Sequence, residues 1–320
     1  MAFTLADYEL TAPPITRAVV RTWREASPIL DMLSFKTSDQ LSQEVLRFDS
    51  LPTVPWRKIG ESFTDLKVTP TPVKERLYFM GAKIDIPREY VKAASLMDNR
   101  AAQSEAIMKG AAYAFNTAFF LNDDAGSIDL DALVGIHHRV VSDLAAAQRF
   151  DAGIDVSADT SLANWQHRLI ETVEDLLDRV DGNPSDKVLF MGRTLYHRLQ
   201  AALRRSSLLS TTTDQLGRQF MTYGQGGAKI VQGGCRVDQT TQILTDTCSG
   251  TALSGSTDSN MYCVRFGEPY VSGWCQEMPT AEDKGETEDG VNFRTIVRFS
   301  PGLYFSNPRS IALAYNFTAA

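Results

Sequence analysis

The chain has 320 residues, of which 43% are hydrophobic, so it can bury a sizeable core as one large domain or as two intimate ones. Its net charge of −7 argues against a protein whose main task is to grip nucleic acid, although a container for a polyanion can be acidic because repulsion keeps the cargo off its wall. The absence of an 18-residue apolar run and of a basic leader followed by an apolar run excludes a membrane-spanning helix and a signal peptide, and predicts a soluble, cytosolic protein.

The first predicted element is an amphipathic helix that begins at Pro14, because proline suits the first helical turn. Ile15, Val19 and Trp23 recur on one face of this helix, and Pro28 ends it. We expect this helix to be a docking arm, with Trp23 in contact with a neighbouring subunit.

Residues 44–86 are predicted to form one long hairpin whose arms exceed what a domain of this size needs. The outgoing arm alternates from Val45 to Asp49, and the return arm runs from Leu77 to Ile84. The intervening stretch of about 25 residues contains four prolines, which cannot donate to a sheet ladder and confine it to edge strands and extended loop. At about 3.3 Å per residue, half of this stretch reaches about 40 Å, roughly twice the expected radius of gyration of the chain.

This stretch is too apolar for a solvated linker, although a disordered linker remains the alternative. Its large hydrophobic side chains are Leu51, Val54, Trp56, Ile59, Phe63, Leu66 and Val68. We therefore predict an interface loop that lies across another subunit. Trp56, Ile59 and Phe63, near its tip, are the predicted intersubunit contacts.

Four further helices and one strand are predicted after the hairpin. A short helix opens at Pro87 and runs through Leu96, and the longest helix spans Asn99–Leu121, with apolar residues at three- and four-residue steps. An amphipathic helix over 161–180 precedes a short apolar strand, Val188–Met191. The strand feeds a third long helix, which together with it forms a compact α/β unit. That helix keeps one apolar row in register: Leu195, Leu199 and Leu203.

The C-terminal third changes to short strands between turns rich in Gly, Ser and Thr, and is predicted to be mostly β. The predicted strands are Lys229–Gln232, Gln242–Leu244, Met261–Phe266, Tyr270–Trp274 and Phe293–Phe299. A loop before the last of these crowds five acids against Lys284 alone: Glu282, Asp283, Glu286, Glu288 and Asp289. A solvated hairpin tip explains such a loop. The alternative is a contact with basic side chains of another subunit, for which Arg17, Arg21 and Arg24 are the candidates.

No motif in the sequence is typical of a catalytic, cofactor or metal site. His137 and His138 are adjacent and point apart on a helix or strand, while His167 and His197 each stand alone. The Gly224 loop lacks the Gly-Lys-Ser/Thr of a phosphate-binding loop and leads into a strand. The four cysteines have no CxxC pair or nearby histidine and are interpreted as small buried hydrophobes. We expect no enzyme, cofactor or metal, although a triad assembled in space leaves no trace in sequence.

In this order of elements the chain resembles the major capsid protein of tailed bacteriophages, whose fold encapsulin shell proteins share. The resemblance rests on the long loop, on Asn99–Leu121 as a spine helix, on Val188–Met191 leading into a helix, and on Ser310–Phe317 as a last strand. It implies an α+β fold with an N-terminal arm, an extended hairpin loop, a spine helix, a peripheral β domain and an axial α/β domain. The implied division is 1–43 for the arm, 44–86 for the loop, 87–135 for the peripheral domain with the spine helix, 136–245 for the axial domain, and 246–320 for a return to the peripheral domain.

The resemblance implies a structural protein that assembles as pentamers and hexamers into an icosahedral head around double-stranded DNA, made in the host cytoplasm and located in the virion. The implied partners are copies of itself, a portal, decoration proteins, and DNA in loose, non-specific contact, without a membrane. A separate scaffolding protein is expected, because Met1 is retained and only about 40 residues precede the loop, which leaves no room for the family's fused scaffolding segment. The alternatives are an encapsulin-like compartment and, from another class, a cytosolic α/β enzyme that uses the Gly224 loop.

Overall fold

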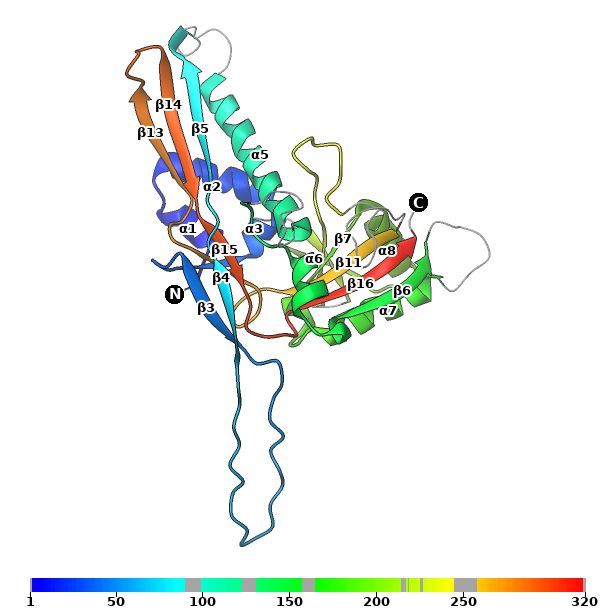
Figure 1. Ribbon diagram of the computed structural model, residues 1–320. Helices are drawn as coiled ribbons and strands as arrows, with labels where there is room; N and C mark the ends of the chain where they lie inside the picture. Colours follow the sequence, from blue (N-terminus) through cyan, green and yellow to red (C-terminus); the bar gives the residue numbers. More distant parts are fainter. Residues whose placement is uncertain are drawn as a thin grey trace.

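The strands form four sheets within residues 2–89, 99–122, 131–156, 165–213, 217, 219–224, 227–244 and 258–318, which the computed structural model describes. Two sheets build a tall body at one side of the molecule, and the largest builds a second body beside it (Figure 1). The fourth is a hairpin from which a long loop projects away from both bodies (Figure 1). This mixture of helices and sheets confirms the predicted α+β class.

The tall body combines a four-stranded sheet, in the order β1–β2–β12–β15, with an antiparallel ribbon, in the order β13–β14–β5. In the ribbon, β14 pairs with β5 along the whole length of both strands, and α5 runs beside them (Figure 1). The strands are β1 (Ala2–Thr4), β2 (Ser34–Thr37), β5 (Met80–Pro87), β12 (Ser272–Cys275), β13 (Thr280–Glu286), β14 (Asn292–Phe299) and β15 (Pro301–Tyr304). The helices are α1 (Leu5–Thr11), α2 (Pro14–Ala26), α3 (Pro28–Met32) and α5 (Asn99–Leu121).

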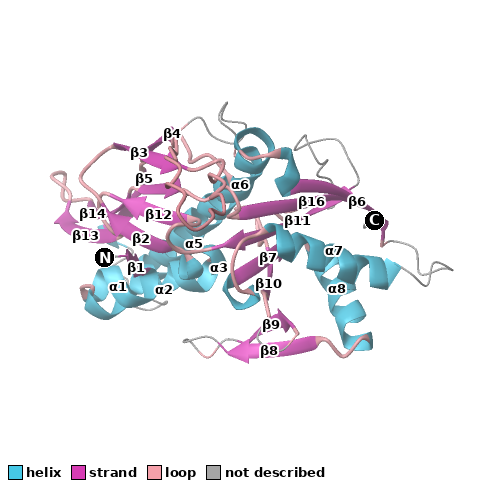
Figure 2. Ribbon diagram, turned by 90° about the horizontal axis from the view of Figure 1, so that it is seen from below, coloured by secondary structure: helices cyan, strands magenta, loops and turns pink. Residues whose placement is uncertain are grey.

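The second body is a seven-stranded sheet covered on both faces. Its strand order is β6 (Arg149–Asp155), β16 (Ile311–Thr318), β11 (Asp258–Arg265), β7 (Lys187–Met191), β10 (Lys229–Gln232), β9 (Gln219–Tyr223) and β8 (Leu209–Thr213). Helices α7 (Trp165–Arg179) and α8 (Arg193–Arg205) cover one face (Figure 2). In β7, Leu189 and Met191 pack against these helices, while Val188 and Phe190 pack against the core on the other face. A strand that is covered on both faces has an uninterrupted run of apolar residues, which is why β7 could be predicted from the sequence.

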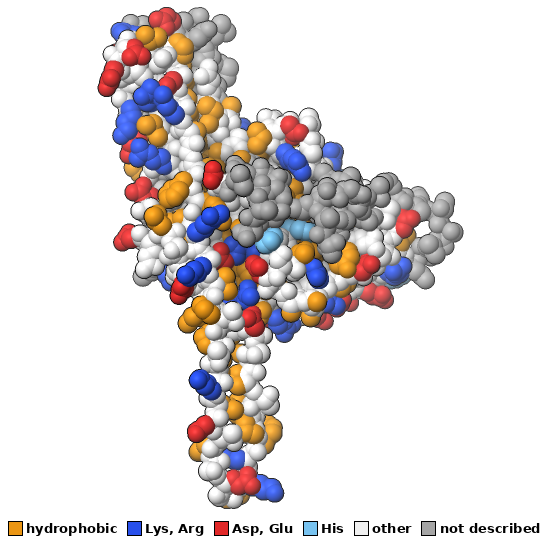
Figure 3. Space-filling model, viewed as in Figure 1, with side chains coloured by type: hydrophobic (Ala, Val, Ile, Leu, Met, Phe, Trp, Pro, Cys, Tyr) orange, Lys and Arg blue, Asp and Glu red, His pale blue; other side chains and the backbone are white. Residues whose placement is uncertain are grey.

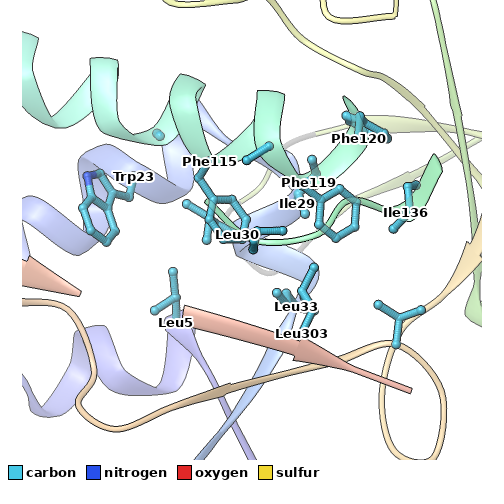
Figure 4. Close-up of a cluster of buried hydrophobic side chains, with 14 of the residues drawn as sticks. Leu5, Trp23, Ile29, Leu30, Leu33, Phe115, Phe119, Phe120, Ile136 and Leu303 are labelled. Atoms are coloured by element: carbon cyan, nitrogen blue, oxygen red, sulfur yellow. The ribbon is translucent and has the colours of Figure 1, made fainter. Parts of the chain in front are cut away.

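The long helix at the centre, α5, joins the two bodies through its last turns. Phe120 lies edge-on to Phe190 of β7 and also contacts Tyr262 of β11, with ring centroids 5.3 and 5.9 Å apart, and Phe119 packs against Phe120 (Figure 4). The next element, α6 (Ile136–His138), begins against the same helix end. A Cβ on Gly135 would lie 2.6 Å from the carbonyl oxygen of Ala118, so no other residue permits this approach.

Helix α2 has the predicted bounds but not the predicted role. It packs within its own chain against α5 and β13, and Trp23 is 1% exposed, with its ring tilted against Phe299 (Figure 4). The prediction that Trp23 contacts a neighbouring subunit is therefore wrong, because its side chain has no surface left to offer. Arg24 is also occupied, since it pairs with Asp31 at 2.7 Å and with Glu9, and so holds α1, α2 and α3 together.

The hairpin is shorter than predicted. Its arms are β3 (Ser42–Arg47) and β4 (Thr71–Arg76), with Leu46 opposite Pro72, whereas β5 belongs to the ribbon. The predicted return arm over Leu77–Ile84 is therefore wrong: this segment leaves the hairpin and enters another sheet. Proline at the start of β4 is tolerated because the two-stranded hairpin has edges on both sides.

The described strands also correct the predicted division of the chain. Strands β11 and β16 lie in the seven-stranded sheet, so residues after 246 do not all return to the tall body. The strand predicted over Gln242–Leu244 is wrong, because only Gln242 makes an isolated bridge, to Cys235. Strand β10 and helix α5 have the predicted bounds, and α8, β7, β11, β12, β14 and β16 agree to within a few residues. The short helix predicted through Leu96 lies outside the described residues.

The root of the hairpin is fixed by a buried ion pair. Glu75 of β4 binds both terminal nitrogens of Arg139, which follows α6, and one of these contacts measures 2.8 Å. The Arg139 side chain is 4% exposed and that of Glu75 is 11% exposed. Arg139 also donates to the carbonyl oxygens of Val134 and Leu303 and lies over the ring of Phe305. This network sets the angle between the hairpin and the junction of the two bodies.

We predict that Glu75→Gln lowers the free energy of unfolding by about 3–5 kcal/mol, because the substitution leaves the buried Arg139 guanidinium without its counter-ion. Urea unfolding of the unassembled subunit at pH 7 measures this. Glu44→Gln is the matched control, since Glu44 pairs with Lys74 on the same hairpin but is exposed, and should change the value by less than about 1 kcal/mol. Equal losses in the two variants would contradict the assigned role.

A second prediction concerns His137, which is buried and lies 2.7 Å from the Tyr262 hydroxyl. Burial, helped by the nearby charges of His138 and Arg149, lowers the pKa of His137 from 6.5 to about 4. The unfolded chain therefore binds this proton more tightly, and the free energy of unfolding should fall as the pH drops from about 6.5 to about 4. His137→Asn should remove about 3 kcal/mol of that fall, measured as urea unfolding at pH 7 and pH 4. His197→Asn, which replaces an exposed histidine far along the sequence from His137, should leave the wild-type difference in place.

Candidate assembly surface

The most exposed apolar side chains of the molecule lie on residues 48–70, which join β3 to β4 and are called the distal loop here. Trp56 and Ile59 are fully exposed, and Phe63 is 82% exposed. A turn in which Glu61 N–H donates to the Lys58 carbonyl forms the tip, with Gly60 at a φ of +93° that favours glycine. The structure thus brings the three predicted contact residues together at or near the tip.

The distal loop has almost no support from its own chain. At its base, Asp49 accepts hydrogen bonds from Arg47 and Thr71 of the two strands. Near the tip the contacts are local: Arg57 lies over the Phe63 ring at 4.3 Å and donates to the Glu61 carbonyl oxygen at 2.8 Å, and the Lys58 N–H donates to the Glu61 carboxylate. Apolar side chains follow the loop along its length (Figure 3). Burying each large apolar side chain against a partner contributes about 1.5–3 kcal/mol, so an isolated subunit leaves this surface unsatisfied.

Two apolar hollows lie on the tall body, away from the distal loop. One, of about 560 Å³, is bounded by α2, α5, β13 and β14, with Ile15 and Met108 in its lining. The other, of about 500 Å³, lies between α5 and the segment that joins β4 to β5, and Phe79 and Val237 are exposed at its rim. Hollows of this size and character accommodate large apolar side chains.

The acidic residues do not form the predicted loop. Glu282, Asp283 and Glu286 lie in strand β13, and only Glu288 and Asp289 lie in the turn before β14. Glu282 pairs with Lys284 at 2.5 Å, and Glu286 lies 3.6 Å from Arg88. Neighbouring cations thus offset part of the repulsion that motivated an intersubunit contact.

The basic partners proposed for the acidic residues are also largely occupied. Arg24 is buried between Glu9 and Asp31, so it is excluded. Arg21 pairs with Glu25, and Arg17 donates to the carbonyl oxygens of Glu9 and Ala12. All five acidic residues are exposed, so their contact with another subunit stays a prediction.

The described residues bring no catalytic constellation together. His137 is bonded to Tyr262 inside the core, and burial raises the pKa of the Cys263 and Cys275 thiols to about 12, which makes them inert hydrophobes. No group of three His, Cys, Asp or Glu side chains suited to a metal ion occurs in this part of the chain. None of the described helices is long and apolar enough to cross a membrane. Cys248 and Gly226 lie outside the described residues.

Sequence reasoning missed two features. The first is the Glu75–Arg139 pair, whose partners are 64 residues apart and leave no local pattern. The second is a concentration of positive charge: residues 187–237 contain eight Lys and Arg but one Asp, a net charge of +7 in a chain of net charge −7. Counting charge by segment, not over the whole chain, would have revealed it.

The fold is found in known structures, although no protein-family model and no curated protein sequence matches the chain. Among solved structures, the holo-SrpI encapsulin complex from Synechococcus elongatus is similar at a TM-score of 0.59 and 12% identity, over 92% of this chain and 89% of that one. The capsid of an empty GTA particle is similar at 0.58 and 12% identity, over 91% and 89% of the two chains. The capsid of Cyanophage P-SCSP1u is similar at 0.55 and 12% identity, over 89% and 86%.

These matches span nearly the whole length of both chains in each pair, so they do not rest on one shared sheet. At about one identical residue in eight, they describe architecture. The chain therefore has the fold that these phage capsid and encapsulin shells share, as the resemblance in its order of elements predicted.

Proposed function

We propose that this chain is a major capsid protein that assembles as pentamers and hexamers into an icosahedral head around double-stranded DNA. The observation that carries the proposal is the distal loop, whose exposed Trp56, Ile59 and Phe63 have no core of their own to enter. A subunit that builds such an arm gains stability only when neighbours cover it. The fold shared with capsid and encapsulin shells supports the same proposal.

The role that we propose is structural and not enzymatic, with the virion as its location and the host cytoplasm as the place of assembly. Identical subunits joined by head-to-tail contacts can close into shells of several sizes or fail to close, so a separate scaffolding protein is part of the proposal. A portal and loosely held DNA are the other partners that a DNA-containing head requires, and decoration proteins are an optional addition to such a head.

An encapsulin-like compartment is the second candidate, and the similarity to the encapsulin complex, at a TM-score of 0.59, favours it. Electron microscopy of the purified protein tests the shared part of both proposals, since closed shells or curved sheets are expected from either. Nuclease treatment of particles isolated from the native source separates them. A head protects genome-length DNA, whereas a compartment encloses protein. A monodisperse monomer that forms no shell with or without a scaffolding protein would contradict both.

We predict that the triple substitution Trp56→Ser, Ile59→Ser and Phe63→Ser abolishes stable shells, because each side chain loses about 1.5–3 kcal/mol of burial in every copy. Sedimentation or particle mass measurement detects the loss, and circular dichroism of the subunit should stay unchanged because the three side chains are exposed in it.

The matched control replaces three exposed apolar residues outside the distal loop and both hollows: Phe3→Ser, Leu10→Ser and Leu41→Ser. It also removes exposed apolar side chains and should retain assembly. Shells of wild-type stability from the distal-loop variant would refute its role as an intersubunit contact.

A further inference from the structure

The positive charge of the chain is concentrated on one part of the second body. Residues 187–237 include β7, α8, β8, β9 and β10 and carry a net charge of +7, so the rest of the chain carries −14. Such a separation of charge within an acidic protein creates a local potential opposite in sign to that of the whole molecule. This region is therefore suited to a polyanionic partner, although the net charge of the whole chain argues against one.

Helix α8 presents the charges of this region to solvent. It contains four arginines and no acid, and its Leu195, Leu199 and Leu203 are fully buried against the sheet. Arg193, Arg204 and Arg205 are exposed, and none of their side chains pairs with a carboxylate among the described residues. Arg193 and Arg204 are eleven residues apart, which is three helical turns, so they lie on the same face.

Strand β8 adds hydroxyl groups beside the arginines. It is the edge strand of the seven-stranded sheet, it contacts α8, and Thr211, Thr212 and Thr213 are exposed along it (Figure 2). Threonine hydroxyls and arginine guanidiniums are the groups that proteins use to bind phosphate oxygens of nucleic acid without reading its bases.

We propose that the exposed face of α8, together with β8, is a binding surface for the phosphodiester backbone of duplex DNA. The inference rests on the proposed function, which supplies the DNA. The 13 residues of α8 extend about 20 Å, a length over which duplex DNA carries about twelve phosphate charges. Three free arginines on that length bind without sequence specificity and release readily, which suits DNA that must be packed and later leave.

The competing occupant of this surface is the acidic face of α7 on a second copy of the chain. The α7 acids are less suited to the role, because Asp175 already pairs with Arg179 and Glu174 accepts a hydrogen bond from the Tyr223 hydroxyl. Part of the charge of this potential partner is therefore occupied within its own subunit, whereas Arg193, Arg204 and Arg205 pair with no carboxylate among the described residues.

The test compares two full-length variants with equal net charge. The first carries Arg193→Gln, Arg204→Gln and Arg205→Gln. The control carries Arg21→Gln, Lys36→Gln and Lys83→Gln, which removes three exposed cations that pair with acids of their own chain. Binding of a labelled 30-bp duplex of mixed sequence is measured from 50 to 200 mM salt. Losing three phosphate contacts should reduce the slope of log affinity against log salt by about 2.7, so the wild-type affinity should fall about 40-fold more than that of the α8 variant over this range.

The control variant should keep the wild-type slope, and a third variant, with Arg193→Lys, Arg204→Lys and Arg205→Lys, should keep it too, because lysine retains the charge. Equal loss in the α8 and control variants would overturn the proposal in favour of a general charge effect. An unchanged slope in the α8 variant together with failed shell assembly would overturn it in favour of the α7 face of a neighbour. Wild-type protein that binds DNA through these arginines but forms no shell would support this surface and reject the proposed function.

Discussion

The packing of the last turns of α5 is the contact on which the remaining architecture depends. Phe119 and Phe120 bring the tall body and the seven-stranded sheet into one continuous core, with Phe190 and Tyr262 as their partners. Aromatic pairs at these separations add about 0.5–1.5 kcal/mol each beyond the area they bury. Without this junction, the tall body and the seven-stranded sheet would lose the centre of their shared core, and the Glu75–Arg139 pair would no longer hold the hairpin against a rigid support.

Around that junction, some charged side chains are paired within the chain, whereas two surfaces have few partners among the described residues. Arg24 pairs with Glu9 and Asp31 and holds the N-terminal helices together. Glu75 pairs with Arg139 at the root of the hairpin. The tip of the distal loop and Arg193, Arg204 and Arg205 of α8 belong to different parts of the molecule and have no comparable partners among the described residues. The same chain therefore offers an apolar surface suited to copies of itself and a charged surface suited to a polyanion, and a folded core keeps them apart.

Sequence reasoning was accurate where a segment's environment is uniform along its length. Helix α5 and strands β7 and β10 have simple patterns because each buries a regular apolar face or run in the core, so these patterns alone defined them. It failed where the partner of a segment decides its role. Trp23 has the features of a docking residue, yet its apolar face is covered by α5 and β14 of the same chain. The change from β4 to β5 also left no local signal, since only pairing with β14 separates the two strands. The tip residues of the distal loop were identified because four prolines and a run of large apolar side chains rarely coexist in a solvated segment.

The ion pair at the hairpin root has a mechanical meaning. With 23 residues between β3 and β4, the distal loop forms a lever about 38 Å long at about 3.3 Å per residue for each half. A rotation of about 5° at Glu75 and Arg139 would carry Trp56 sideways by about 3 Å, close to the diameter of a methyl group. A rotation too small to disturb the packing of the core would thus be large enough to move Trp56 into or out of contact with a partner. In the shell that we propose, the Glu75–Arg139 pair would limit how far the distal loop can turn to follow the curvature between neighbouring subunits.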